Sequence, residues 1–184
     1  MAYPIRNLEP NITHHIFSRC VETKMYLKKG KMKKMFCNII KKAQKKYKFD
    51  LNGFMIMHNH FHFIITTVTD GATIDRIMQY IKSKFAKLYN KIHKRVGAFW
   101  SERYKNQILE YSKKTENYFN ILITYLGYNP VKAGITKKPL LFKYSSFKNY
   151  LGLDNDLGIE IKIHPHFKNE LFRELCDLRS AIYS

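Results

Sequence analysis

Three of the eight histidines of this chain occur at a spacing of two, as His58, His60 and His62. They lie in a mostly apolar stretch, residues 54–65, whose aromatic and β-branched side chains favour a buried β-strand. Residues two apart in a strand project from the same face, so His60 and His62 would present two imidazoles side by side. Such a pair on a rigid element suits a divalent metal ion, provided that a third ligand comes from elsewhere in the chain.

The alternative for this pair is a structural role, in which each buried imidazole is simply hydrogen-bonded to its neighbours. Two such residues in one apolar strand need two sets of partners, and metal binding is therefore the preferred hypothesis. His58 has a different place, because residues 58 and 59 form a short link between two predicted strands. The letters His-Asn-His do not indicate an HNH nuclease, whose motif is dispersed over a longer ββα unit.

A third ligand and a nucleophile are offered by a later segment, the predicted helix that should end before Pro130. Asn129 would present a carbonyl oxygen at the end of this helix, and Tyr125 lies one turn earlier on the same face. A phenolic oxygen beside a metal-bound phosphate could attack it as a nucleophile. None of the HExxH, P-loop or GxSxG motifs occurs in the sequence.

The hydrophobic pattern predicts the elements that must position these residues. Strands are predicted at residues 11–20, 49–57, 60–68 and 105–111. Helices are predicted at residues 31–47, from the N-cap Thr73 to about 96, at 114–128 and at 165–183, with a short aromatic helix or capping segment at 144–151. This order predicts an α+β fold of the ferredoxin-like kind, with an antiparallel sheet and helices packed on it.

Two of these elements have clearly different faces. In the first strand, alternation places Thr13, His15, Phe17 and Arg19 together on one face. The first helix has an apolar stripe, and its opposite face is predicted to carry Lys31, Lys33, Lys34, Lys41, Lys42, Lys45 and Lys46. No acidic residue occurs between residues 23 and 49, so this face is expected to lie near phosphates rather than only in solvent.

The charge of the whole chain also indicates a polyanionic partner. There are 33 Lys and Arg against 14 Asp and Glu, a formal net charge of +19. A Lys-rich source organism would explain the use of Lys in place of Arg, but not the shortage of acids. Nucleic acid is therefore the preferred partner, and an anionic membrane surface is the weaker alternative.

Other features point to a cytoplasmic protein with no membrane partner. The sequence has no run of about 18 apolar residues and no apolar signal segment near its first residue. The three cysteines, Cys20, Cys37 and Cys176, lack CxxC spacing and are interpreted as reduced structural thiols.

Six segments, in order, resemble the motifs of the single-tyrosine HUH transposases, which are IS200-like, and in particular of their REP-associated tyrosine transposase branch. They are THHIFSR (13–19), MIMHNHFHFII (55–65), IMQYIKSKFAKLYNK (77–91), AFWSERY (98–104), TYLGYNPVKAGIT (124–136) and KYSSFKNYLG (143–152). The resemblance covers roughly residues 12–152, and the second and fifth segments are specific when they occur together.

The resemblance implies an activity and a site. His60 and His62 would be the HUH pair, Asn129 the third ligand of Mg²⁺ or Mn²⁺, and Tyr125 the nucleophile. The substrate would be single-stranded DNA, often beside a hairpin. Attack by the tyrosine would give a 5′-phosphotyrosine link and a free 3′-OH, and rejoining would reverse the step. The fold would be that of HUH endonucleases and transposases.

Further residues are expected at the DNA. Arg19, Lys82, Lys84 and Arg103 are the candidates for phosphate contacts. The family has Pro at the position of His58, so a changed turn is preferred to an added metal ligand as the meaning of this departure. The general base that would activate the tyrosine is not identified by the sequence.

The expected organisation is one HUH transposase-like domain at residues 1–152, with a C-terminal loop and helix at 153–184 as an extension of the same domain. The protein would act as a monomer or homodimer. Two rival functions stay open. One is a catalytically silent hairpin-DNA-binding protein derived from a transposase, and the other is a zinc-dependent hydrolase that uses His58, His60 and His62.

Overall fold

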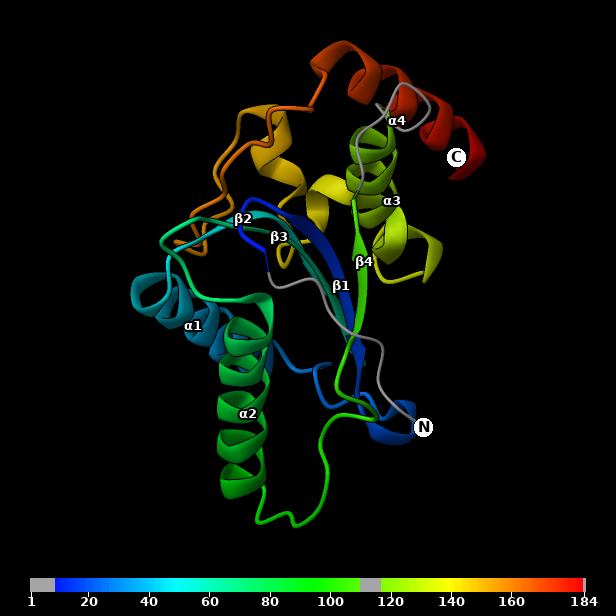
Figure 1. Ribbon diagram of the computed structural model, residues 1–184. Coiled ribbons are helices and arrows are strands. Elements are labelled where there is room, and N and C mark those ends of the chain that lie inside the picture. The colour runs from blue at the N-terminus through cyan, green and yellow to red at the C-terminus, as the bar shows by residue number, and fades with distance from the viewer. Residues whose placement is uncertain (1–8, 110–116, 184) are drawn as a thin grey trace.

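The computed structural model describes residues 9–109 and 117–183 and has a four-stranded antiparallel sheet with helices on both faces (Figure 1). The strands are β1 (Thr13–Arg19), β2 (Phe49–Ile56), β3 (His60–Thr67) and β4 (Lys105–Ile108), in the spatial order β2-β3-β1-β4. The helices are α1 (Gly30–Lys46), α2 (Ile74–Ile92), α3 (Tyr118–Lys132) and α4 (Asn169–Tyr183), with 3₁₀ turns η1 (Val21–Thr23), η2 (Pro139–Leu141) and η3 (Phe147–Leu151). This element order and strand order confirm the predicted ferredoxin-like α+β fold.

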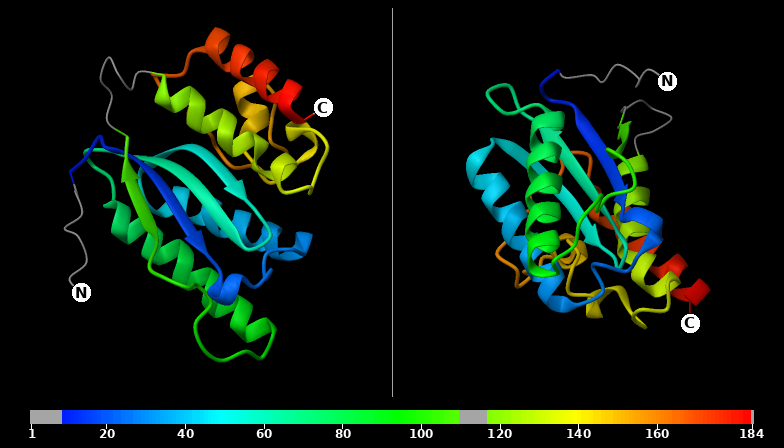
Figure 2. Two further views of the ribbon diagram at one scale, coloured as in Figure 1. Left: turned by 90° about the vertical axis from the view of Figure 1, so that its right-hand side faces the viewer. Right: turned by 90° about the horizontal axis from the view of Figure 1, so that it is seen from below.

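The sheet separates two hydrophobic cores. Helices α1 and α2 cover one face, and α3, α4 and the turns η2 and η3 lie over the other (Figure 2). The first core is rich in aromatic side chains and includes Ile16, Phe36, Phe61, Phe63 and Phe85. The second core includes Met55, Ile64, Phe119, Phe147 and Phe172. The sheet is therefore buried on both sides over most of its area.

The pleat of β3 divides its side chains between these two layers. Phe61 and Phe63 enter the core under α1 and α2, so the alternate residues His60 and His62 project toward the α3 side. The register with β1 places Arg19 opposite His60 and Phe17 opposite His62 on that same side. The predicted alternation of the first and third strands is thus observed.

The prediction that the third helix stops near Asn129 is wrong. Pro130 lies inside α3, where it removes one N–H donor from the hydrogen-bond ladder, and the helix continues past it for two more residues. The helix ends instead at Lys132 and is followed by Gly134, which adopts a left-handed φ of 65°. The amide groups of Gly134 and Ile135 donate to the carbonyls of Val131 and Pro130, each at 2.9 Å, in the Schellman pattern.

Three other predicted boundaries also differ. The second helix begins after Thr73 as predicted, although the Thr73 side chain makes no capping hydrogen bond, and it ends at Ile92 rather than near residue 96. The fourth strand ends at Ile108, and residues 110 and 111 of the prediction lie outside the described part. Helix α4 begins at Asn169, four residues after the predicted start at residue 165.

The early end of α2 again reflects a Schellman pattern. Lys94 takes a left-handed φ of 48°, and the Arg95 amide donates to the Asn90 carbonyl at 2.8 Å. A lysine in this conformation is uncommon, and the sequence offered Gly97, at φ 94°, as the more obvious terminator.

Lys33 corrects the predicted lysine face of the first helix. Its side chain is buried, with the ammonium group 5.4 Å from the Tyr144 ring centroid and 5.9 Å from that of Phe142. Burial lowers the pKa of Lys33 to about 8. The exposed basic side chains on α1 include Lys31, Lys34, Lys42, Lys45 and Lys46.

None of the helices in the described part of the chain is long and apolar enough to span a membrane.

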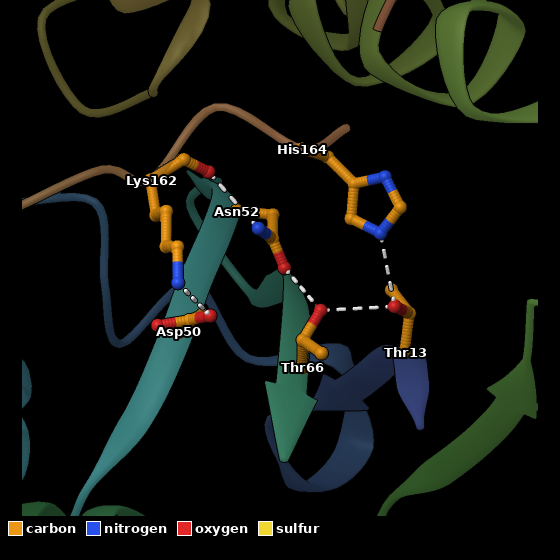
Figure 3. A network of polar contacts seen from close by, with 6 residues as sticks. All are labelled: Thr13, Asp50, Asn52, Thr66, Lys162 and His164. Atoms are coloured by element: carbon orange, nitrogen blue, oxygen red, sulfur yellow. Dashed lines mark hydrogen bonds and ion pairs between the residues drawn. The ribbon is translucent and has the colours of Figure 1, made fainter. Parts of the chain in front are cut away.

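A network of polar side chains attaches the segment before α4 to the sheet (Figure 3). The Lys162 ammonium pairs with Asp50 at 2.7 Å, and the Lys162 carbonyl accepts from the Asn52 amide at 2.9 Å. Thr66 links Asn52 to Thr13, whose hydroxyl contacts His164 Nε2 at 3.1 Å. The chain after residue 152 is thus bonded directly to β1 and β2, and Thr66 of β3 joins the two contacts.

Helix α3 is seated closely by a glycine. A Cβ atom at Gly127 would lie 2.0 Å from Cδ2 of Phe147, which is a buried residue of η3. Only the absence of a side chain lets α3 approach this ring. Because Tyr125 and Asn129 flank Gly127 on the same helix, this contact sets the position of both.

We expect Gly127→Ala to destabilise the protein. The added methyl group would overpack against Phe147, at a cost of about 1–3 kcal/mol, which exceeds the roughly 1 kcal/mol that Ala gains over Gly in a helix. Urea unfolding of the wild type and the variant measures the difference. In a Phe147→Leu background the same change should cost less, because the smaller side chain can yield. A Gly127→Ala protein as stable as the wild type would contradict the close contact.

Candidate functional site

An open depression of about 600 Å³ lies between the sheet and α3. Its floor comes from β1, β3 and β4, and one wall comes from α3. The lining residues are His15, Phe17, Arg19, Met57, His60, His62, Lys105, Asn106, Gln107, Tyr125, Asn129, Lys132 and Ala133. The structure therefore brings together four of the residues singled out from the sequence for catalysis or metal binding, from elements far apart in the chain.

The two histidines of β3 lie side by side in this depression. Their ring centroids are 5.3 Å apart with an interplanar angle of 83°. His62 is buried, whereas His60 is only partly covered. The two imidazoles are thus rigidly placed at the base of the depression and accessible from it.

Tyr125 and Asn129 approach the histidines from α3. The Tyr125 ring stands perpendicular to that of His62, with 6.3 Å between centroids, and 38% of this tyrosine is exposed. Asn129 follows one helical turn later on the same side. Its Nδ2 atom is buried and has no hydrogen-bond partner among the described residues. The phenol and the amide therefore face the same space as the histidine pair.

Burial keeps these imidazoles neutral. It lowers the pKa of His60 to about 4, with a smaller contribution from the positive charge of Arg19. Burial, followed by the neighbouring His15 and His60, lowers the pKa of His62 to about 2. Burial also lowers the pKa of His15 to about 4. Neutral imidazoles have a free nitrogen lone pair, which is the form that binds metal ions.

These residues fit a divalent metal ion. The buried Asn129 Nδ2 lacks a hydrogen-bond partner among the described residues, at a cost of about 1–3 kcal/mol. Because Nδ2 is a donor, an acceptor such as a phosphate oxygen would offset that cost, while the amide oxygen would be the ligand of the metal ion. His60 and His62 would offer two imidazole nitrogens and Asn129 one amide oxygen to Mg²⁺ or Mn²⁺. Within residues 9–109 and 117–183, no three His, Cys, Asp or Glu side chains gather in a possible metal site. The candidate set therefore depends on the asparagine.

The remaining predicted residues are distributed unevenly. Arg19 lines the depression, but Lys82 is buried and donates to Ser18 Oγ and to the Glu102 carbonyl, both at 2.7 Å. Arg103 forms an ion pair with Asp75 at 2.9 Å. Lys84 is exposed on α2, on the other side of the sheet from α3. His58 lies in the link between β2 and β3 and is not a lining residue, which agrees with its interpretation as a turn residue.

Several lining residues were not proposed from the sequence. His15 and Phe17 alternate with core residues in β1, so the strand pattern already placed them on the face of Arg19. Lys132 lies one turn beyond Asn129, where the predicted helix had already ended. Lys105 and Gln107 are exposed on the edge strand β4 and carried no distinctive signal.

Comparison with known protein families identifies the chain. The family model described as "Transposase IS200 like" matches residues 9–120, which is more than half of the sequence. The chain belongs to the IS200-like transposase family. The matched residues include His60 and His62 and end before Tyr125, so this family match does not extend to the second half of the depression. No curated protein gives a significant match.

Comparison with solved structures bears on the fold alone. A REP-associated tyrosine transposase, solved bound to a REP hairpin, has a TM-score of 0.68 and 17% identity, with 91% of this chain and 98% of that chain covered. A crystal structure of a transposase candidate from Deinococcus radiodurans has a TM-score of 0.44 and 12% identity, covering 68% of this chain and 98% of the other. Only the first is similar enough to bear on the fold of this IS200-like transposase.

Membership of the family supports a transposase type of role, and transposases of this family generally depend on divalent metal ions. Such a role agrees with the charge of the depression. The charged residues among those lining it are Arg19, Lys105 and Lys132, all basic. The depression thus combines neutral ligands at its base with positive charge around them.

The depressed pKa of His62 predicts that the metal-free protein loses stability in acid. Between the unfolded pKa of about 6.5 and the folded value, only the unfolded chain takes up a proton. The stabilisation is therefore complete above about pH 6.5 and decreases as the pH falls, by on the order of 1–2 kcal/mol at pH 5 for this residue. Urea unfolding at neutral pH and at about pH 5 measures the loss, which should be smaller in His62→Gln. Equal losses in both proteins would show that another group titrates.

Proposed function

We propose that this IS200-like transposase cleaves and rejoins single-stranded DNA beside a hairpin, through a covalent intermediate on Tyr125. The observation that carries the proposal is the shared depression, in which Tyr125 and Asn129 of α3 face His60 and His62 of β3. A phenol, an amide and two neutral imidazoles around one basic hollow are suited to chemistry on a phosphodiester.

Tyr125 would act as the nucleophile. Its oxygen would form a bond to phosphorus while the bond from phosphorus to the 3′ oxygen breaks, and the phenolic proton would leave to a base. The departing 3′ oxygen would take up a proton and become a free 3′-OH. The DNA would then be held as a 5′-phosphotyrosine, and attack by a 3′-OH would reverse the step. No bond energy is lost overall, so no nucleotide cofactor is required.

His60, His62 and Asn129 would hold Mg²⁺ or Mn²⁺ in this proposal. When bound there, the ion would supply Lewis-acid polarisation of the scissile phosphate. The protein contributes the fixed placement of these side chains, since both histidines are held by a central strand and the asparagine by α3. Such fixed placement supplies much of the advantage of an enzyme over solution chemistry.

The DNA strand would follow the basic side of the depression. A smaller hollow shares Phe17, Arg19 and Lys105 with it, and the lining of this hollow also includes Glu22 and Glu102. Phosphates could pair with Arg19 and Lys105 along this path, and Phe17 offers a partly exposed ring on which a base could stack. The hairpin in the related REP-associated structure is a reason to test hairpin-bearing substrates first.

The proposed site is complete within one chain, because α3 packs over the sheet of the same chain. This arrangement supports action as a monomer, and a homodimer would need no exchange of the tyrosine helix. The proposal also includes residues 153–184 in the same domain as residues 1–152. The bonds from Lys162 and His164 to the sheet support that assignment.

We expect Tyr125→Phe to abolish formation of a covalent protein–DNA adduct. The phenylalanine ring preserves the packing but lacks the attacking oxygen. The measurement is a denaturing gel of the protein incubated with labelled single-stranded hairpin DNA and Mg²⁺ or Mn²⁺. Tyr118→Phe, a matched change two turns earlier in α3, should retain the adduct.

The outcomes of this experiment separate the rival functions. An adduct that persists in Tyr125→Phe would exclude this nucleophile. Binding without any adduct in the wild type would favour a catalytically silent hairpin-binding protein. Metal-dependent hydrolysis that survives the change would favour a hydrolase. A mixture of Tyr125→Phe with His60→Ala should stay inactive if each site is built from one chain, and restored activity would indicate exchange of α3 between protomers.

We expect Arg19→Gln to weaken binding of single-stranded DNA, whereas Lys84→Gln should leave it nearly unchanged. Arg19 lies at the depression, while Lys84 lies on the opposite side of the sheet. Loss of one phosphate contact should reduce the slope of log affinity against log salt by about 0.7. Binding isotherms at several salt concentrations measure both quantities. Equal effects of the two changes would indicate that general charge, and not the depression, attracts the DNA.

A further inference from the structure

Both histidines of the proposed metal site have their Nδ1 atoms occupied. His60 Nδ1 lies 2.6 Å from Oδ1 of Asn59, and His62 Nδ1 lies 3.0 Å from Nε2 of His15. If each Nδ1 carries the proton, each Nε2 has a lone pair free for a ligand in the depression. The tautomers of the two rings therefore decide whether this pair can bind a metal ion.

The tautomer of His60 is fixed by an asparagine. The Asn59 side-chain Nδ2 donates to the Thr23 carbonyl at 3.3 Å, which orients the amide so that its oxygen faces His60. An amide oxygen can only accept a hydrogen bond, so His60 Nδ1 must be the donor. The Nε2 atom of His60 is consequently unprotonated and available.

The tautomer of His62 is not fixed in this way, because its partner is another imidazole. Either ring of the His15–His62 pair can be the donor. If His15 donates from Nε2, a neutral His62 carries its proton on Nε2 and cannot bind a metal through that atom. If His15 accepts, His62 Nε2 is free. The state of His15 thus controls the second ligand of the pair.

We propose that His15 is a positioning residue, which accepts a hydrogen bond from His62 Nδ1 and so holds His62 in its metal-binding tautomer. The inference rests on the proposed function of the depression. The two ring planes are nearly parallel, with an interplanar angle of 15° and centroids 5.3 Å apart, so His15 restrains the orientation of His62 as well as its proton. Both residues lie on adjacent central strands, β1 and β3, which makes the contact rigid.

A neutral acceptor suits this position. Metal-bound histidines commonly donate to a carboxylate or a carbonyl oxygen. A carboxylate beside His62 would add a negative charge next to the site of an anionic phosphodiester, and that charge would repel the substrate. An imidazole supplies the acceptor without the charge, in keeping with a depression whose charged lining residues are all basic.

The first test observes the metal-free wild type directly. Imidazole nitrogen NMR of the full chain, with the His62 signals assigned through His62→Gln, reports which nitrogen of each ring is protonated. We expect His62 to carry its proton on Nδ1 and His15 to have an unprotonated Nε2. A His62 protonated on Nε2 would overturn the proposal, whatever the protein does to DNA.

The second test measures Mn²⁺ affinity by calorimetry for four proteins. His15→Leu removes the acceptor and should weaken binding by about 10–100-fold. His15→Gln retains an acceptor oxygen and should recover most of the affinity. His58→Gln changes a histidine in the link between β2 and β3, outside the depression, and should match the wild type. Thermal unfolding checks that each variant is folded.

Two results of this measurement would overturn the proposal. One is an unchanged affinity in His15→Leu. The other is an equal loss in His15→Gln and His15→Leu, which would indicate that His15 binds the ion itself. A wild type that binds Mn²⁺ normally but forms no DNA adduct would refute the proposed function and leave the role of His15 standing. If the wild type binds no Mn²⁺, the proposed metal site fails and the NMR result alone decides the tautomer.

Discussion

The alternation of side chains along β3 is the constraint on which the rest of this structure depends. Phe61 and Phe63 fill the core beneath α1 and α2, and they can do so only if His60 and His62 face the opposite layer. A shift of one residue would bury the histidines among aromatic rings and expose the phenylalanines. The energy of the larger aromatic core therefore determines which side of the sheet the imidazoles face, and their hydrogen bonds to Asn59 and His15 act within that arrangement.

A second constraint determines what the imidazoles face. Helix α3 reaches the sheet closely because Gly127 leaves room for Phe147, and it continues past Pro130 to a Schellman turn at Gly134. These features place Tyr125 and Asn129 over the depression in successive turns. The same continuation adds Lys132 to its rim. The proposed catalytic groups are thus set by backbone packing, which leaves their side chains free for chemistry.

The fold could be predicted from the sequence because it depends on periodic patterns. The same patterns predict which faces of the strand and helix carry the candidate residues of the site. Alternation around His60 and the helical spacing from Tyr125 to Asn129 correctly predict which side chains share a face. The end of α3 could not be predicted, since Pro130 usually restricts the residue before it and the override comes from tertiary packing. The burial of Lys33 and Lys82 was missed because long side chains can turn inward toward aromatic rings and carbonyls, which periodicity does not report.

Two buried side-chain nitrogens in the described residues lack a hydrogen-bond partner, His14 Nε2 and Asn129 Nδ2, and their surroundings differ in an informative way. His14 lies on the core side of β1, where its other nitrogen contacts Asn106 at 3.1 Å, and it is not one of the residues that line the depression. Asn129 borders the depression that His60 and His62 also line. An unsatisfied polar group in a closed core is a cost of packing, whereas one at the edge of a basic hollow is available to a ligand. The position of Asn129, more than its residue type, is what connects α3 to the histidine pair.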